Sequence, residues 1–461
     1  MRGRVWTMVA AFAAVVLLVL VLAPRFMAQR AGDGSDSAEL VFLAPPDLER
    51  IVQRLLDDFH REFPGIRVAY RPLSGSNDER RPLDELVANG GTAADVVAVD
   101  FPSVAAWQAA GRALELERFG AQSGLDEFLP AAARAVSVND MTYGMPWMMD
   151  VGVLYYRRDL IEGAGADPPG TWQDLIALSR RFIDSGAVEW GFAFAGEEGD
   201  GLARLFLELL WANGGRLVDD GELAIDSPEA REALGFLRDL IHSHRVSPPD
   251  AADWSEEQSR EAFLAEQALL LRHTTKLWTT REERQAAVER FGVAQLPAGP
   301  RGTGGAVSVS GLALVIDRDT SRPEAAWEFV RWLTGDEAQR TLALEGSRLP
   351  ARVSVYNEPE VPAREPFFPR HYTIATNHGF LLPSYANWPG ISRAIARNVH
   401  RVLNGELSID EALARLRAEL DPLIPPQARR ERRETPTGIE LGGGEWPGRP
   451  RPPLTSTGLL L

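Results

Sequence analysis

Cysteine is absent from all 461 residues of the chain. Its absence excludes disulfide bonds, thiolate metal sites, iron–sulfur clusters, a cysteine nucleophile and a lipid-modified N-terminal cysteine. Positive charge is also in short supply, because 49 Lys and Arg residues face 65 Asp and Glu residues and leave a net charge of -16. Nucleic acids and anionic membrane surfaces repel an acidic protein, so we expect no nucleic-acid partner.

Common signatures of catalytic and metal-binding sites are missing as well. We find no G-x-S-x-G nucleophile motif and no H-E-x-x-H zinc motif. The segment LPAGPRGTGG is rich in glycine but lacks the Lys-Ser/Thr of a phosphate-binding loop. The seven histidines are scattered, and His242 and His244 are two residues apart, which is not a ligand spacing on one helical face. We therefore predict no metal site and no cofactor.

The first 31 residues have the order of charge and hydrophobicity of an export signal. Arg2 and Arg4 precede an apolar run from about Val5 to Ala23. That run approaches the roughly 20 residues that span a bilayer, so residues 1–31 are either a cleaved signal peptide or a retained membrane anchor. In both cases we expect the protein in the periplasm or on the extracytoplasmic face of the plasma membrane.

The residues after this signal alternate between strand and helix patterns. ELVFLA and IRVAYR have the composition of strands, and ADVVAVD that of a strand buried on both faces of a parallel sheet. Between the first two, apolar residues from Leu48 to Phe63 recur at the spacing of an amphipathic helix. This order of elements indicates an α/β domain.

The rest of the chain is predicted to form a second lobe, a return to the first, and a tail. A mostly helical block follows Leu154, and the strand AVSVSGLALVI comes after it. We expect the chain to cross between lobes near residues 150, 306 and 355. Lobe 1 would then contain residues 38–150 plus 307–355, and lobe 2 residues 151–306 plus 356–421. Residues 422–461 are rich in Pro, Gly and Arg, which predicts a disordered tail.

The chain resembles extracellular solute-binding protein family 1, the sugar-binding proteins of ABC importers, through segments that recur there in the same order: ADVVAVD, YGMPWMMDVGVLYYRRDLI, ELLWANGG, FGVAQLPAGPRG, PEAAWEFVRWLTGDEAQ and LPSYANWPGISRAIARNVHRVLNGELSIDEALARL. The resemblance covers roughly residues 38–421 and is closest to the maltose/trehalose type. The chain departs from the family in three places: it has no lipid-attachment cysteine, it has GGAVSVSG where members often carry an aromatic residue after the glycines, and it has the tail.

The resemblance implies an α/β, two-lobed periplasmic-binding-protein fold of type II, with mixed sheets flanked by helices and a ligand cleft between the lobes. It implies a monomer that captures an oligosaccharide such as maltose or trehalose and closes on it by a hinge motion. The partner that receives the sugar would be the transmembrane subunits of an ABC permease. No bond is made or broken in this task, so we expect no catalytic residue and no enzyme activity.

Two acidic residues are the first candidates for ligand contact. Asp100 ends ADVVAVD, where the resemblance puts a sugar-binding acid, and ligands of open α/β sheets lie beyond the carboxyl ends of strands. Asp150 lies among apolar residues in the strand that leads past the cleft in the family, and a buried carboxylate needs a partner. The alternatives are a helix cap over residues 103–110 for Asp100 and a salt bridge with Arg157 or Arg348 for Asp150.

Aromatic rings are the second kind of candidate, because they can stack on the apolar C–H faces of a sugar. We expect Trp278 to face the cleft, since it follows the polar loop RHTTK after a strand. Tyr156 follows Tyr155 in a strand, so it points to the other side and is assigned to the core. The further candidates for ligand contact are Trp211, Trp388, Trp147, Tyr155, Ser310, Gly311 and Arg348.

Two other functions stay open at this point. A secreted glycosidase could use Asp100 and Asp150 as its carboxylate pair, and the release of product from maltose, trehalose or longer glucans would identify it. The same fold could carry ferric iron on the adjacent tyrosines, as ferric-binding proteins do, although successive residues of a strand face opposite sides.

Overall fold

The computed structural model describes residues 38–73, 94–278, 280–426 and 429. The predicted signal or anchor lies outside these residues, and so does most of the predicted tail. Within the described ranges, no helix combines the length and the hydrophobicity that a membrane crossing needs.

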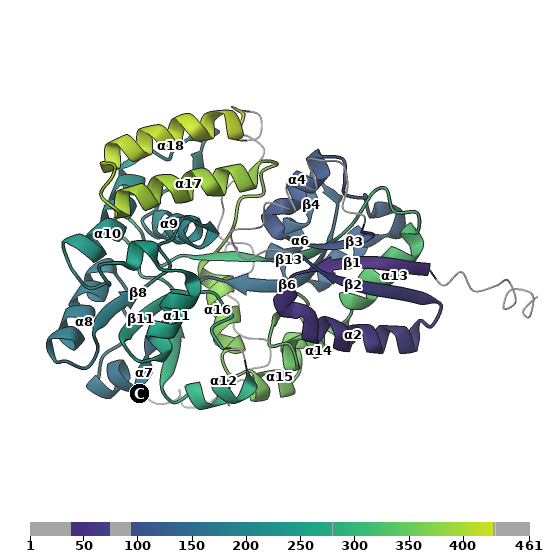
Figure 1. The fold of residues 1–461 in the computed structure, drawn as a ribbon, viewed down its shortest axis with the longest axis horizontal. Helices are drawn as coiled ribbons and strands as arrows, with labels where there is room; N and C mark the ends of the chain where they lie inside the picture. The colour runs from purple at the N-terminus through teal and green to yellow at the C-terminus, as the bar shows by residue number, and fades with distance from the viewer. Residues whose placement is uncertain (1–37, 74–93, 279, 427–428, 430–461) are drawn as a thin grey trace, which may run out of the picture.

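A seven-stranded mixed sheet forms one half of the molecule, at the right of Figure 1. Its strands are β1 (Ala38–Ala44), β2 (Ile66–Pro72), β3 (Val96–Asp100), β6 (Met145–Val151), β13 (Val307–Ile316), β14 (Leu349–Pro350) and β15 (Gly379–Leu381). Their order is β14-β6-β13-β3-β1-β2, and β15 also pairs with β13. β1 is parallel to β2 and β3, whereas β13 is antiparallel to β3 and β6. The sheet is therefore mixed, as expected.

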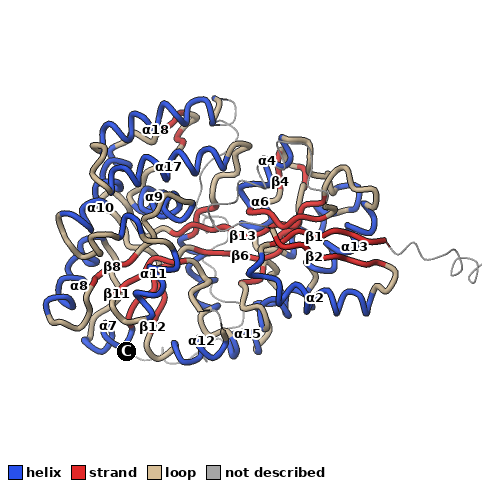
Figure 2. The backbone as a smooth tube through the Cα atoms, viewed as in Figure 1, coloured by secondary structure: helices blue, strands red, loops and turns tan. Residues whose placement is uncertain are grey.

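A four-stranded sheet forms the other half, at the left of Figures 1 and 2. It has the order β12-β7-β11-β8, with β7 at Val153–Arg157, β8 at Trp190–Ala193, β11 at Ala268–His273 and β12 at Phe291–Ala294. Two small hairpins join β4 (Ser137–Val138) to β5 (Met141–Thr142) and β9 (Val218–Asp219) to β10 (Glu222–Leu223).

Helices surround both sheets (Figure 2). With the seven-stranded sheet lie α2 (Glu49–Glu62), α4 (Val104–Ala109), α5 (Ala121–Gly124), α6 (Pro130–Ala135), α13 (Pro323–Leu333), α14 (Asp336–Leu344) and α15 (Glu360–Arg364). The others are α7 (Arg158–Ile161), α8 (Trp172–Asp184), α9 (Asp200–Ala212), α10 (Pro228–His242), α11 (Glu256–Leu264), α12 (Arg281–Ala287), α16 (Phe368–His378), α17 (Trp388–Leu403) and α18 (Ile409–Leu423).

The first strand–helix–strand unit shows why the periodic pattern was informative. The buried residues of α2 are Ile51, Val52, Leu55, Leu56 and Phe59, which follow the predicted helical spacing. The Phe59 ring meets Phe329 of α13 edge-on at 5.0 Å between centroids. Each fully buried side chain of this size contributes about 1.5–3 kcal/mol, so the apolar face of α2 fixes the helix against the sheet.

The chain passes from the seven-stranded to the four-stranded sheet at Gly152, between β6 and β7. It returns between β12 and β13, and in Figure 1 both β6 and β13 run through the middle of the molecule. One strand departs from the expected division: β15 belongs to the residues assigned to lobe 2, yet Gly379–Leu381 pairs with Val307–Val309 of β13. The lobe boundaries remain a prediction.

A buried ion pair holds these two crossing strands. Arg272 of β11 donates two hydrogen bonds to Glu208 of α9, at 2.8 and 2.7 Å. The backbone N–H and the hydroxyl of Ser308 on β13 donate to the same carboxylate, at 3.1 and 2.5 Å. The Gly152 N–H donates to the Ser308 carbonyl at 2.9 Å. Helix, sheet and both crossings therefore meet at Glu208.

Gly152 is glycine because of space. A Cβ built there would lie 1.9 Å from Glu208 Oε1 and 2.8 Å from Arg272 Nη2. The close approach of these side chains, and not a special backbone conformation, therefore requires a glycine at this position.

We expect Gly152→Ala to lower the free energy of unfolding by about 1–3 kcal/mol, the usual cost of forcing an extra methyl group into a packed site. Urea unfolding of the full chain measures this change. Gly163→Ala is the matched control, because a Cβ at Gly163 meets no atom within 4 Å. Equal stability losses in the two variants would contradict the close approach at Gly152.

Candidate ligand site

The pairing register brings three predicted ligand residues to one face of the seven-stranded sheet. β13 lies between β3 and β6; its Ser310 is paired with Asp150, and its Leu312 with Asp100. Directly paired residues, and residues two apart in one strand, point to the same side of a sheet. Asp100, Ser310 and Asp150 therefore share one face, at the point where β3 ends and β6 leaves the sheet.

Asp150 is held in one orientation by hydrogen bonds. Its Oδ1 accepts from the Thr275 hydroxyl at 2.7 Å, the Thr275 N–H at 3.2 Å and the Val151 N–H at 3.1 Å. Burial by itself would raise the pKa of Asp150, but the charges of Lys276 and Arg204 and the bonds from Thr275 lower it below the ordinary 3.8. Asp150 is therefore ionised, and its other oxygen, Oδ2, accepts no hydrogen bond from the described residues.

The structural alternatives for the two acids are wrong. Arg157 pairs with Asp159 at 2.6 Å and Glu266 at 3.1 Å, so it does not neutralise Asp150. Arg348 pairs with Asp47 at 2.8 Å, so it forms its ion pair with an acid of the first lobe and not with Asp150.

The capping role considered for Asp100 is also not observed. Asp100 precedes a short 3₁₀ turn, Phe101–Ser103, and α4 begins at Val104. Within the described chain, its side chain makes no capping hydrogen bond to that turn. The carboxylate thus ends a buried strand, Val96–Asp100, at the sheet edge where the sequence placed it.

Trp278 and Tyr155 belong to an aromatic cluster next to Asp150. Trp278 is 7% exposed and stacks on Phe367 at 4.4 Å between centroids. Tyr155 is fully buried, meets Trp278 edge-on at 5.3 Å, and donates its hydroxyl hydrogen to the Thr274 carbonyl at 3.2 Å. His371 completes the cluster, with Nε2 at 3.3 Å from the Tyr155 hydroxyl. These rings stack on one another, whereas the sequence placed them at a cleft surface.

The remaining predicted rings are buried as well. Trp147 is fully buried, and its ring meets Phe42 of β1 edge-on at 5.7 Å, inside the core of the seven-stranded sheet. Trp211 stacks on Phe380 at 5.1 Å. Trp388, the first residue of α17, is 5% exposed. The ring partners of Trp147 and Trp211, Phe42 and Phe380, lie more than 100 residues away along the chain, so the sequence does not reveal them.

Gly311 marks a close contact between strands. A Cβ there would lie 2.1 Å from the Met148 carbonyl and 2.8 Å from the Phe101 ring. It belongs to the opposite face from Ser310, since the two are successive residues of β13.

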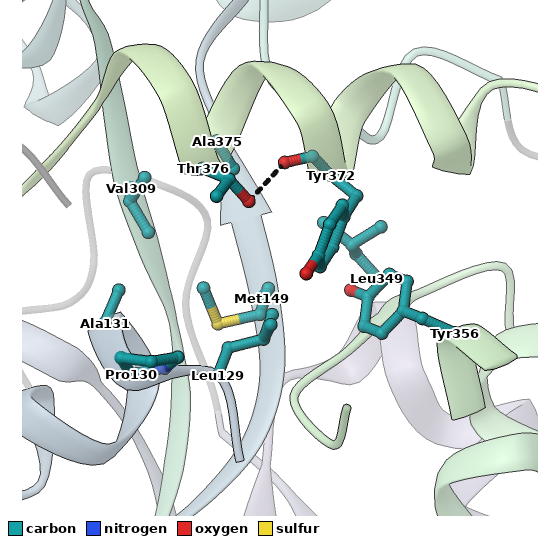
Figure 3. A pocket seen from close by; sticks show the side chains of 10 residues that line it. All are labelled: Leu129, Pro130, Ala131, Met149, Val309, Leu349, Tyr356, Tyr372, Ala375 and Thr376. Atoms are coloured by element: carbon teal, nitrogen blue, oxygen red, sulfur yellow. Dashed lines mark hydrogen bonds between the residues drawn. The ribbon is translucent and has the colours of Figure 1, made fainter. Parts of the chain in front are cut away.

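That opposite face carries a small apolar pocket, shown in Figure 3. Met149 and Val309, the sequence neighbours of Asp150 and Ser310, form its floor, and Tyr372, Ala375 and Thr376 of α16 cover it. The other lining residues are Leu129, Pro130, Ala131, Leu349 and Tyr356. No predicted ligand residue lines this pocket. A sugar needs several hydrogen-bonding groups, so the polar face is the candidate site.

Sequence reasoning missed the charged residues around Asp150. The charges of Lys276 and of Arg204 in α9 lower the pKa of Asp150. Lys276 follows Thr275, which binds Asp150, and Glu256 of α11 lies against the start of α9. The ion pair of Arg272 and Glu208 lies at the strand crossings described above. The available signal was the position of Arg204 and Glu208, four residues apart in an otherwise apolar helix. Among the described residues, no group of three or more His, Asp or Glu side chains is arranged to hold a metal ion.

Comparison with known proteins gives three findings. The family of bacterial extracellular solute-binding proteins matches residues 45–340. A probable ABC transporter-binding protein of Deinococcus radiodurans is 29% identical over 303 residues, 63% of this chain and 71% of that protein. A maltotriose-binding protein of Pyrococcus abyssi is 26% identical over 59% of this chain and 58% of its own length.

A solved structure agrees with these sequence matches. The maltose-bound MalE3 of T. maritima superposes with a TM-score of 0.76 at 30% identity, covering 84% of this chain and all of that one. The predicted two-lobed periplasmic-binding-protein fold of type II is thereby confirmed.

His371 gives a pH-dependent test of the aromatic cluster. Burial lowers its pKa from 6.5 to about 3, and the charge of Asp150 opposes this only in part. The unfolded chain therefore takes up a proton near pH 6.5 that the folded chain takes up only near pH 3. The stability that this group contributes is fully present above pH 6.5 and is lost as the pH falls toward 3.

We expect His371→Phe to reduce the loss of unfolding free energy between pH 7 and pH 5.5 by about 1 kcal/mol relative to the wild type. Urea unfolding at the two pH values measures it. Tyr155→Phe is the control, because it removes the hydroxyl beside His371 and keeps the titrating group. A loss of the same size in wild type and His371→Phe would show that the histidine is not buried as neutral imidazole.

Proposed function

The chain belongs to the family of bacterial extracellular solute-binding proteins, and on that premise we propose that it binds an oligosaccharide of the maltose or trehalose kind and delivers it to an ABC permease. The names of its relatives support the ligand class, since they include a maltotriose-binding protein and a maltose complex. The observation that carries the proposal is the shared face of Asp100, Ser310 and Asp150 on neighbouring strands.

The chemistry of this face suits sugar hydroxyls. The lowered pKa of Asp150 keeps it charged, and a charged acceptor strengthens a hydrogen bond from a hydroxyl. Three bonds to Oδ1 hold the carboxylate in place before a ligand arrives, which reduces the entropy cost of binding. In the proposal, Asp100 and Ser310 contact the ligand from the adjacent strands. Among the predicted rings, Trp388 is the best candidate for stacking on a sugar, because no other ring is stacked on it among the described contacts.

We place the ligand between the two lobes and expect them to close on it about the crossings near Gly152 and between β12 and β13. Two-lobed binding proteins move in this way. The protein would act outside the cytoplasm as a monomer, exported by residues 1–31, and would present its loaded form to the permease subunits. N-terminal sequencing of the exported protein distinguishes a cleaved signal from a retained anchor.

The two alternatives receive less support. The family consists of binding proteins, and nothing in the ligand proposal requires Asp100 and Asp150 to break a glycosidic bond. An iron site on the adjacent tyrosines would need both hydroxyls at one ion. The Tyr155 hydroxyl donates to Thr274 and the Tyr156 hydroxyl to Glu162 at 2.9 Å, as expected for successive strand residues that face opposite sides.

We expect maltose or trehalose to raise the melting temperature of the full chain, because a ligand that binds only the folded state stabilises it by about 2.7 kcal/mol at a hundred times Kd. The failure of every neutral sugar in a thermal-shift panel, or the release of product, would count against the proposal.

Asp150→Asn keeps the size of the side chain and removes its charge. A hydrogen bond to a charged group contributes roughly 1.5–3 kcal/mol, so titration calorimetry should show Kd rising about tenfold or more. Asp159→Asn is the control, since Asp159 follows the end of β7 and pairs with Arg157, whereas Asp150 is bound by Thr275. Equal affinities of the two variants for the sugar would show that Asp150 does not contact the ligand.

A further inference from the structure

Lys276 is the only lysine in the 461 residues of the chain, and all other cationic side chains are Arg. It is exposed, and it lies one residue after Thr275, whose backbone and hydroxyl hold Asp150. Its charge is close enough to lower the pKa of Asp150. Among the described residues, Lys276 has no acidic partner within ion-pair distance. The one lysine thus lies close to the predicted ligand acid, Asp150, without forming an ion pair with it.

Arg204 is the second unpaired cation at this place. It lies in the middle of α9, is only 8% exposed, and within the described chain makes no hydrogen bond and no ion pair. Other buried arginines are paired: Arg272 with Glu208, and Arg157 with Asp159. Burying a charge without a partner is costly. The Arg204 charge lowers the pKa of Asp150 and of Glu256, while its own hydrogen-bond donors have no partner among the described residues.

Glu256 completes the group from the other side. A Cβ at Gly201, one turn before Arg204 in α9, would lie 2.9 Å from Glu256 Oε1, so this carboxylate lies against the start of that helix. Burial by itself would raise the pKa of Glu256, but the positive charges of Arg272 and Arg204, and of His273 when it is protonated, lower it below its ordinary value. Burial lowers the pKa of His273, which is therefore neutral at pH 7.

We propose that Arg204 and Lys276 are ligand-binding residues which, together with Asp150 and Glu256, hold a neutral polyhydroxylated ligand through charge-assisted hydrogen bonds. This inference rests on the proposed function and refines its ligand class. Two cations and two carboxylates sum to zero charge, so the group offers strong donors and strong acceptors without favouring a ligand of either sign. Neutral hydroxyl groups, which both donate and accept, match such a set.

Ring stacking has a smaller part in this recognition. Trp278 is stacked on Phe367, Trp211 on Phe380, and Trp147 lies in a core. The site should therefore distinguish ligands by the positions of their hydroxyl groups and bind linear polyols as well as sugar rings.

The first test separates binding from stability in one variant. Arg204→Met should weaken the binding of the sugars that the wild type binds, from a panel of maltose, trehalose and mannitol, by tenfold or more, and should lower the melting temperature by less than the loss of a buried ion pair does. Arg272→Met is the matched control: it breaks the buried pair with Glu208 and should lower the melting temperature. Unchanged affinity in Arg204→Met, or a stability loss as large as that of Arg272→Met, overturns the role of Arg204.

The second test uses the wild-type chain and needs no variant to fold. Acetylation with an amine-reactive ester modifies Lys276 and the N-terminal amine alone, because the chain has no other lysine. Saturating sugar should slow the acetylation of Lys276 several-fold and leave the rate at the N-terminus unchanged, as measured by mass spectrometry. Equal rates at Lys276 with and without the bound sugar overturn its role.

Glucuronate serves as the charged probe. Tighter binding of glucuronate than of the neutral panel overturns the neutral ligand class and identifies an anion site. If the wild-type chain binds none of the neutral probes, the proposed function and this inference are overturned together. If Arg204→Met still binds the sugar with unchanged affinity and the bound sugar does not slow the acetylation of Lys276, only the inference is overturned.

Discussion

The buried pair of Glu208 and Arg272 is the contact on which the relation of the two sheets depends. Glu208 accepts from Arg272 and from Ser308, and its carboxylate occupies the space that a side chain at residue 152 would need. A buried pair of this kind adds little to stability compared with an apolar contact. Its effect here is positional, because it fixes where both crossing strands leave one sheet for the other.

Most of the secondary structure was predictable from the sequence because it follows local patterns. The apolar spacing of α2, the continuous apolar run of β3 and the break at Gly335 between α13 and α14 all require only neighbouring residues. The place of β15 was not predictable in this way. Its partner is β13, more than 60 residues earlier in the chain, and a three-residue strand carries too short a pattern to specify such a pairing.

The residues of the candidate site likewise divide into those that a local sequence pattern indicates and those that only the tertiary structure reveals. Asp100 and Asp150 were predicted as candidates because a carboxylate in an apolar run stands out in a sequence, and the register places Ser310 on the strand between them. The rings were harder, since an aromatic residue has the same appearance in a sequence whether it lines a cleft or packs in a core. Trp278 and Tyr155 were predicted to contact the ligand, and only the tertiary structure reveals Phe367 and His371 beside them. Arg204 was missed because opposite charges four residues apart in a helix, such as Arg204 and Glu208, are a common ion-pair spacing and do not by themselves indicate a ligand site.

β6 and β13 present polar residues on one face and line an apolar pocket with the other, so both faces of the two strands are constrained by their surroundings. A substitution on either face changes one environment and leaves the other intact. An insertion or deletion of one residue would exchange the faces, moving Asp150 or Ser310 toward the pocket and Met149 or Val309 toward the charged group. Ligand specificity can therefore diverge through point substitutions in these strands, whereas a change in strand length would disrupt both faces.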